Sequence, residues 1–260
     1  MKPSFPLLVA HETRYDGLIF LRNRQSQFFT LALPVLFLVI LASVFSGGTV
    51  AVAGGSLKVS VYYVPGIMTL GIVAASFINL VISVTTARET GIYKRRRATP
   101  VPASVVIAGR ALTAVVAALV IAAVLLAIGW PAYGASLPSR TAPAFILAII
   151  VGALAFCCLG YAVASLIENA DAAQPLTQAV MLPLYFISGV FVPASQIPGW
   201  LRNVASVFPV RHLAQALLAA YNPHTSGAGF AWRDLGVVAL WGASGLVVAL
   251  RRFSWLPLGR

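Results

Sequence analysis

The chain has 260 residues, of which 60% are hydrophobic and 9% are charged, whereas soluble domains have about 45–50% apolar and about 25% charged residues. This composition excludes an ordinary soluble protein and predicts an integral membrane protein. The net charge of +12 does not indicate nucleic-acid binding, because the Lys and Arg residues gather at the ends of apolar segments, as expected beside anionic membrane lipids.

The apolar segments predict an all-α integral membrane fold. They are continuous and rich in Ala, Leu and Val, whereas the strands of a membrane barrel alternate over short segments. A helix needs about 20 residues to cross the hydrocarbon core. We expect one transmembrane domain over residues 1–260, with six transmembrane helices at residues 28–45, 62–86, 104–130, 143–167, 176–192 and 235–250.

Residues 1–27 predict an amphipathic helix in the membrane interface, because apolar residues recur there at helical spacing between charged ones such as Glu12. The first span contains Pro34, where a kink is expected. Residues 46–61 contain four glycines and predict a short flexible loop.

Three polar residues, Ser76, Asn79 and Ser83, share one face of the second predicted span. Two interpretations remain open for them. They form hydrogen bonds between helices, each worth on the order of 1 kcal/mol, or they line the path of a transported molecule.

A basic segment at residues 87–103 fixes the orientation of the chain. Arg88, Glu89 and the run Lys94–Arg97 cannot lie in hydrocarbon, and their cation count predicts the cytoplasmic side. With both termini also cytoplasmic, thirteen of the eighteen Lys and Arg residues lie inside. These are Lys2, Arg14, Arg22, Arg24, Arg88, Lys94, Arg95, Arg96, Arg97, Arg110, Arg251, Arg252 and Arg260.

The segment after the fourth span is the least regular part of the chain. Residues 168–175 predict an inner loop, and Gln178 and Pro183 interrupt the fifth span. Residues 193–232 are too polar and too rich in proline to cross a membrane, yet too apolar for a solvated loop. We expect re-entrant helices on the outer side, between spans five and six, with a break near Pro209.

No catalytic or metal-binding pattern is apparent. The six acidic residues and three histidines lie at or beyond the ends of the predicted spans, whereas ion-coupled carriers normally keep ionisable groups inside the bundle. None of the three lysines follows a phosphate-binding glycine loop. We therefore expect no catalytic residue, no metal and no cofactor bound by this chain, and an ATPase, if one is needed, on another chain.

Two runs carry a family resemblance. RETGIYKRRRATPVP (residues 88–102) and PLYFISGVFVPASQIPGWLRNVASVFPVRHLAQAL (residues 183–217) resemble the cytoplasmic signature and the proline-turn region of the permease subunits of type-two ATP-binding-cassette (ABC) exporters. The six-span plan with an N-terminal interfacial helix is similar as well. Many members of that family have Leu where this chain has Tyr93.

The resemblance implies a half-transporter in the bacterial plasma membrane that pairs with a second copy or a paralogous permease. An ABC ATPase, which would hold ATP and Mg, is expected to bind the loop between spans two and three together with the N-terminal helix. The residues implied in this coupling are Glu12, Arg88, Glu89, Thr90, Gly91, Ile92 and Tyr93. The residues implied at the inner leaflet, where they also fix the orientation, are Lys94, Arg95, Arg96 and Arg97.

The favoured hypothesis is ATP-driven export of an amphipathic drug, lipid or secondary metabolite, because the interior of the spans carries no charge and Arg110 marks only the inner edge of the third. Export of a polysaccharide, a stand-alone channel or carrier, and a scaffold without transport are the alternatives. The candidate residues of a cargo path are Ser76, Asn79, Ser83, Gln178 and Tyr185.

Overall fold

A computed structural model describes residues 4–97 and 101–252. Residues 98–100 of the predicted coupling loop, and the side chains of Arg96 and Arg97, lie outside the described part. The elements in chain order are α1 (Phe5–Arg22), α2 (Arg24–Gln27), η1 (Phe28–Ala32), α3 (Leu33–Val44), β1 (Thr49–Val52), β2 (Gly55–Lys58), α4 (Val59–Val73), η2 (Ala74–Ile78), α5 (Asn79–Glu89), α6 (Ile92–Arg97), α7 (Ala103–Tyr133), α8 (Ala142–Ala164), α9 (Ala170–Ile187), η3 (Ala194–Gln196), α10 (Gly199–Ala205), α11 (Pro209–Tyr221) and α12 (Trp232–Arg252).

Four helices within the described residues are long and apolar enough to cross a membrane. They are Val59–Glu89, which joins α4, η2 and α5, then Ser104–Tyr133, Ala142–Ala164 and Trp232–Arg252. The predicted first and fifth spans are helical too, in Thr30–Val44 and in α9. Neither counts among these four, so the six-span plan remains a prediction.

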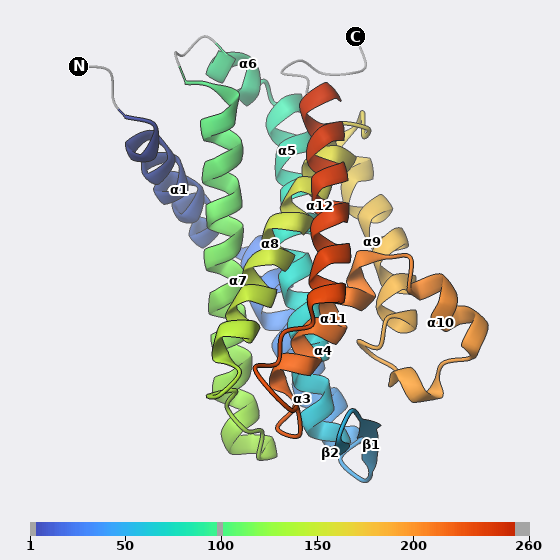
Figure 1. The fold of residues 1–260 in the computed structure, drawn as a ribbon. Helices are drawn as coiled ribbons and strands as arrows, with labels where there is room; N and C mark the ends of the chain where they lie inside the picture. Colours follow the sequence, from blue (N-terminus) through green and yellow to red (C-terminus); the bar gives the residue numbers. More distant parts are fainter. Residues whose placement is uncertain (1–3, 98–100, 253–260) are drawn as a thin grey trace.

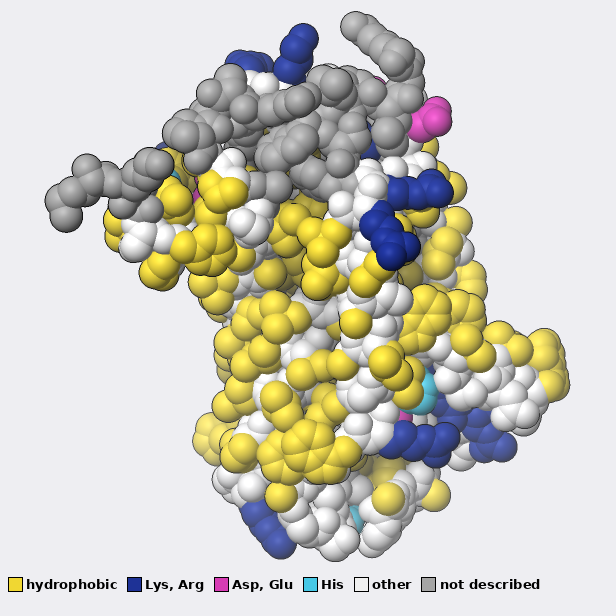
Figure 2. All heavy atoms as spheres, turned by 45° about the horizontal axis from the view of Figure 1, so that its top comes forward, with side chains coloured by type: hydrophobic (Ala, Val, Ile, Leu, Met, Phe, Trp, Pro, Cys, Tyr) yellow, Lys and Arg dark blue, Asp and Glu magenta, His cyan; other side chains and the backbone are white. Residues whose placement is uncertain are grey.

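The helices form an elongated bundle with two distinct ends (Figure 1). The start of α1, the short helix α6 and the last turn of α12 lie at one end, which we call the terminal end. The β1–β2 hairpin lies at the other, which we call the hairpin end. Hydrophobic side chains cover much of the body between the ends, while Lys and Arg side chains gather near them (Figure 2).

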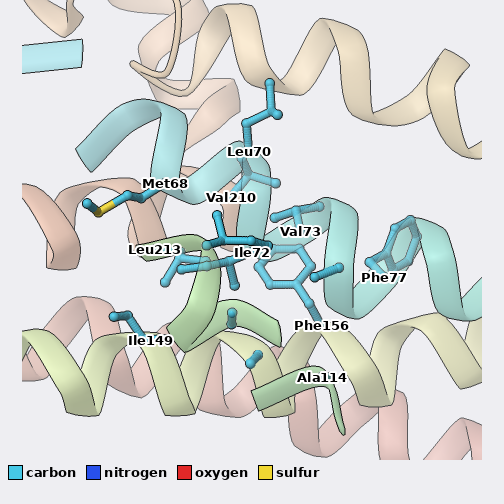
Figure 3. Packing of buried hydrophobic residues seen from close by; sticks show 14 of the residues in the cluster. Met68, Leu70, Ile72, Val73, Phe77, Ala114, Ile149, Phe156, Val210 and Leu213 are labelled. Atoms are coloured by element: carbon cyan, nitrogen blue, oxygen red, sulfur yellow. The ribbon is translucent and has the colours of Figure 1, made fainter. Parts of the chain in front are cut away.

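The core of the bundle is the long helix Val59–Glu89, in which almost every side chain of α4 and η2 is buried. Ile72, Val73 and Phe77 face Phe156 of α8 and Val210 of α11 (Figure 3). A helix that is apolar all round is expected to be surrounded by other helices. The same helix therefore contacts α3, α7, α8 and α11.

Helices α8 and α12 have the most extensive contact of any two helices among the described residues. A Cβ added at Gly242 would lie 2.7 Å from the Cα of Ala155, and one at Gly245 would lie 2.9 Å from the backbone N of Leu159. Small residues let helix backbones approach in this way inside membranes. The glycines of α12 thus fix its position against α8.

Two predicted loops contain regular structure. The prediction of a flexible loop over residues 46–61 is wrong, and the predicted inner loop is shorter than expected, because α8 ends at Ala164 and α9 begins at Ala170. Residues 46–61 contain an antiparallel hairpin, in which Val50 pairs with Leu57 and both are buried. Asn222 Nδ2 donates to the carbonyl of Ala53 at 2.8 Å, which fixes the hairpin to the end of α11. The predicted inner loop 168–175 contains the start of α9, where the Asn169 side chain accepts a hydrogen bond from the Asp171 N–H at 2.9 Å.

The segment 193–232 contains the expected short helices. Helix α10 ends at Ala205 and α11 begins at Pro209, which confirms the predicted break. Proline suits the first turn of a helix because it has no N–H to leave unbonded there. How deeply these helices enter a membrane stays a prediction.

Candidate functional site

The terminal end carries a sharp corner between α5 and α6. Gly91 adopts φ +72° between the two helices, a left-handed conformation that glycine adopts without steric cost. Its N–H donates to the carbonyl of Arg88 at 3.2 Å. A Cβ at this position would meet no atom within 4 Å, so the requirement for glycine comes from the backbone alone.

Arg88 lies beneath this corner and points into the protein. Its side chain is buried, and its guanidinium donates to the carbonyls of Ala164, at 3.0 Å, and of Ile167. Ala164 is the last residue of α8, where carbonyls lack a partner within the helix. Arg88 therefore joins the corner to the end of α8, and its charge is not presented at the surface.

The other predicted coupling residues divide between surface and core. Glu89 and Thr90 are exposed, Gly91 is half-buried and Ile92 is 44% exposed, whereas Tyr93 is buried. Glu89 Oε2 also accepts a hydrogen bond from the N–H of Ala170 at 3.3 Å, at the first residue of α9. The exposed corner, formed by Glu89, Thr90, Gly91 and Ile92, thus touches the ends of two long helices.

Lys94 and Arg95 continue from this exposed corner into α6, and both are exposed. Their side chains add positive charge beside it at the terminal end.

Helix α1 is fixed to α7 at the same end. The Cβ of Glu12 would lie 2.7 Å from a Cβ at Gly109, so the two backbones are closely packed here. The buried Asp16 Oδ2 and the half-buried Arg110 Nε form an ion pair at 3.1 Å. Arg110 also donates to Ser83 Oγ at 3.2 Å, which links α1, α7 and α5 through one guanidinium.

A cavity of about 270 Å³ lies among η1, α3, the long helix Val59–Glu89, and α9. We call it the polar cavity. Its lining residues are Asn23, Ser26, Thr30, Leu33, Phe37, Leu70, Ala74, Ile78, Asn79, Ile82, Gln174, Gln178, Leu182, Tyr185 and Phe191. Leu70 extends to the side of its helix away from Ile149 (Figure 3), which is consistent with a place in this wall.

Three of the five predicted cargo residues, Asn79, Gln178 and Tyr185, line the polar cavity together. Ser83 lines only a smaller neighbouring cavity, with Asp16 and Arg110. Ser76 lines neither, because it is buried and its hydroxyl donates to the carbonyl of Ile72 at 2.5 Å. The structure therefore separates Ser76 from Asn79 and Ser83, which line the neighbouring cavity together.

A π-helical turn explains this separation. Residues Ala74–Ile78 form the turn η2, and the Asn79 N–H bonds the carbonyl of Ala74, five residues back. The extra residue rotates everything that follows by about 100° relative to an α-helix. Asn79 is thereby turned towards α2, where its Oδ1 accepts a hydrogen bond from Ser26 Oγ at 2.5 Å.

Comparison with known proteins identifies the family. The profile of the ABC-2 type transporter family matches residues 13–222, most of the chain. The chain belongs to the ABC-2 type transporter family. The described apolar helices agree with a multi-pass permease of that family.

Two curated relatives have the printed name "Probable multidrug ABC transporter permease YbhR", one from Escherichia coli K12 and one from Escherichia coli O157:H7. Each is 26% identical over 160 residues, which are 62% of this chain and 43% of the relative. The chain thus spans less than half the length of these relatives.

In this ABC-2 permease, sequence reasoning missed the other half of the polar cavity. Asn23 and Ser26 come from α1–α2, in a segment assigned to the interface, and Gln174 was assigned to a loop. Phe37 and Phe191 resemble ordinary apolar span residues. The Ser26–Asn79 hydrogen bond joins residues 53 positions apart, and no local sequence pattern indicates such a contact.

Proposed function

We propose that this ABC-2 permease is the membrane-spanning subunit of an ATP-driven exporter that moves amphipathic drugs, lipids or secondary metabolites out of the cytoplasm or the inner leaflet. The polar cavity carries this proposal. It combines amide and hydroxyl side chains with aromatic rings among helices of the membrane domain, as expected of a small-molecule site. The name of the E. coli relatives supports a drug-like cargo.

The terminal end is proposed to face the cytoplasm. The exposed Lys94 and Arg95, and Arg251 and Arg252 at the end of α12, lie there, in accord with the tendency of cations to remain inside. Both termini are then cytoplasmic, and the hairpin and α10 lie on the outer side of a bacterial plasma membrane.

An ABC ATPase subunit, holding ATP and Mg, is proposed to bind the exposed corner with help from α1. Ile92 supplies an apolar anchor, and Glu89 a negative charge beside it. A displacement of this corner reaches α8 through Arg88 and α9 through the Glu89–Ala170 bond. Arg88 and Tyr93 then hold the corner in shape, while the exposed residues meet the partner. A second permease, identical or paralogous, completes the transporter.

The experiment is co-expression with a candidate ATPase, followed by copurification and ATP-driven transport. Ile92→Asp places a charge in an apolar contact, and we expect binding to weaken by about 2 kcal/mol or more, with matching loss of transport. Glu89→Ala should lower transport as well. Arg252→Ala is the control, because it removes an exposed charged side chain at the same end, on α12 and outside the corner. Equal ATPase binding by Ile92→Asp and the wild type would refute this docking site.

A further inference from the structure

The polar cavity is lined by two unlike kinds of group. Ser26, Asn79 and Gln178 contribute amide and hydroxyl groups to its lining, whereas Phe37, Tyr185 and Phe191 contribute aromatic rings. The ring centroid of Phe191 is 5.2 Å from that of Phe37 and 6.0 Å from that of Tyr185. A bound molecule would therefore meet both hydrogen-bonding groups and aromatic faces in one cavity.

One buried polar atom in the cavity wall, the hydroxyl oxygen of Tyr185, could bond to a bound molecule. Tyr185 is 3% exposed, and its hydroxyl has no hydrogen-bond partner among the described residues. A buried hydroxyl without a partner costs about 1–3 kcal/mol relative to a bonded one. A hydroxyl, ether or carbonyl group of a guest in the cavity would recover that loss.

The described lining of the polar cavity contains no Asp, Glu, Lys, Arg or His. The neighbouring cavity, which shares Asn23, Ser26 and Asn79, holds a charge of each sign, but Asp16 and Arg110 pair at 3.1 Å. By contrast, the cavity at the hairpin end includes Asp234 and His224. An adjoining apolar cavity, which shares Phe37, Leu182 and Phe191, has no charged residue in its described lining either. The uncharged lining of the polar cavity thus continues into this neighbour and contrasts with the other two cavities.

We propose that the polar cavity binds uncharged amphiphiles and discriminates against permanently cationic ones. A charged group that leaves water without a counter-ion loses its hydration and gains nothing equal in return, whereas a hydroxyl or amide finds partners in Gln178, Asn79 and Tyr185. This binding preference would define the cargo class of the proposed exporter. The preference itself can be tested without transport, and only its link to export rests on the proposed function.

The test is direct binding to the purified full chain in phosphatidylcholine nanodiscs. Three dansyl amides share one aromatic body and differ in the tail: a neutral hydroxyethyl group, a trimethylammonium-ethyl cation and a carboxymethyl anion. Fluorescence titration, with empty nanodiscs subtracted, gives each Kd. We expect the neutral probe to bind at least about tenfold more tightly than the cation, given the cost of an unpaired buried charge.

Gln178→Glu adds one carboxylate with little change of shape. It should tighten binding of the cationic probe by about tenfold and weaken binding of the anion. Asn79→Asp is the second variant, should Gln178→Glu fail to fold. Asn203→Asp is the control, because Asn203 is exposed on α10 and lines none of the four cavities, so the wild-type preference should persist.

The results separate the inference from the proposed function. Equal or tighter binding of the cation by the wild type, no saturable binding of any probe, or no response to Gln178→Glu and Asn79→Asp each overturn the cargo class. Preferential binding of the neutral probe without ATP-driven movement leaves the cargo class standing and refutes export. ATP-driven movement with equal binding of all three probes supports export and refutes the cargo class.

Discussion

Replacement of Arg88 by methionine tests how the terminal end is built. The guanidinium donates two charge-assisted hydrogen bonds, to the carbonyls of Ala164 and Ile167, and such bonds contribute about 1.5–3 kcal/mol each. Methionine keeps the apolar stem and removes both donors. We expect Arg88→Met to lower the free energy of unfolding by about 3–5 kcal/mol, allowing for partial access of water to the freed carbonyls.

The assay is unfolding by SDS in mixed micelles, followed by far-UV circular dichroism. Arg95→Met is the control, because Arg95 is exposed in α6 and surface substitutions typically change stability by less than about 0.5 kcal/mol. Equal stability of Arg88→Met and Arg95→Met would refute the reasoning. If Arg88→Met were stable and lost only ATPase binding, Arg88 would contact the ATPase directly, as the sequence suggested.

Two further substitutions test the packing that holds the site. Gly242→Val forces α12 away from Ala155, whose Cα lies 2.7 Å from a Cβ at Gly242, and should lower the unfolding free energy by about 1–3 kcal/mol in the same SDS titration. Gly236→Val is the control, because a Cβ there meets no atom within 4 Å, and it should show only the small change expected from helix propensity. Equal losses in the two variants would contradict the close contact. Asp16→Ala removes the carboxylate from the half-buried Arg110 guanidinium and should cost about 3 kcal/mol, the lower end for a broken buried pair, because the Arg110 side chain is 20% exposed. The same titration measures the loss, and the double variant with Arg110→Ala should recover much of it. A harmless Asp16→Ala would contradict the ion pair.

Hydrophobic composition was sufficient to predict the four long apolar helices. The second prediction, residues 62–86, falls within Val59–Glu89, and the fourth, 143–167, overlaps Ala142–Ala164 closely. A run of apolar residues specifies a membrane helix locally, because the bilayer interior requires the backbone to satisfy its own hydrogen bonds. The remaining two predicted spans are shorter or contain prolines, so composition alone leaves them open.

Features that depend on distant contacts escaped prediction. The residues around Ala53 do not indicate that Asn222 will donate a hydrogen bond to the hairpin. The residues around Arg88 do not indicate that its guanidinium will donate to the carbonyl of Ala164. A flexible loop and a surface charge were therefore reasonable local interpretations. The structure replaces both with long-range hydrogen bonds that local patterning does not encode.

The candidate cargo site was predicted in part. Asn79, Gln178 and Tyr185 stand out as polar groups in apolar runs, and they do meet in one cavity. Ser76 has the same appearance in the sequence but satisfies its hydroxyl within its own helix. The π-turn that separates it from Asn79 has no sequence signature, so an α-helical projection of residues 76–83 misplaces them.

The most direct measurement of the proposed function is movement of the neutral dansyl probe by proteoliposomes. Permease alone, candidate ATPase alone, and both together are compared with and without ATP. The proposal predicts movement only when both subunits and ATP are present, and its loss in Ile92→Asp. Equal movement by the permease alone, or no movement by a complex that hydrolyses ATP and binds the probe, would contradict it.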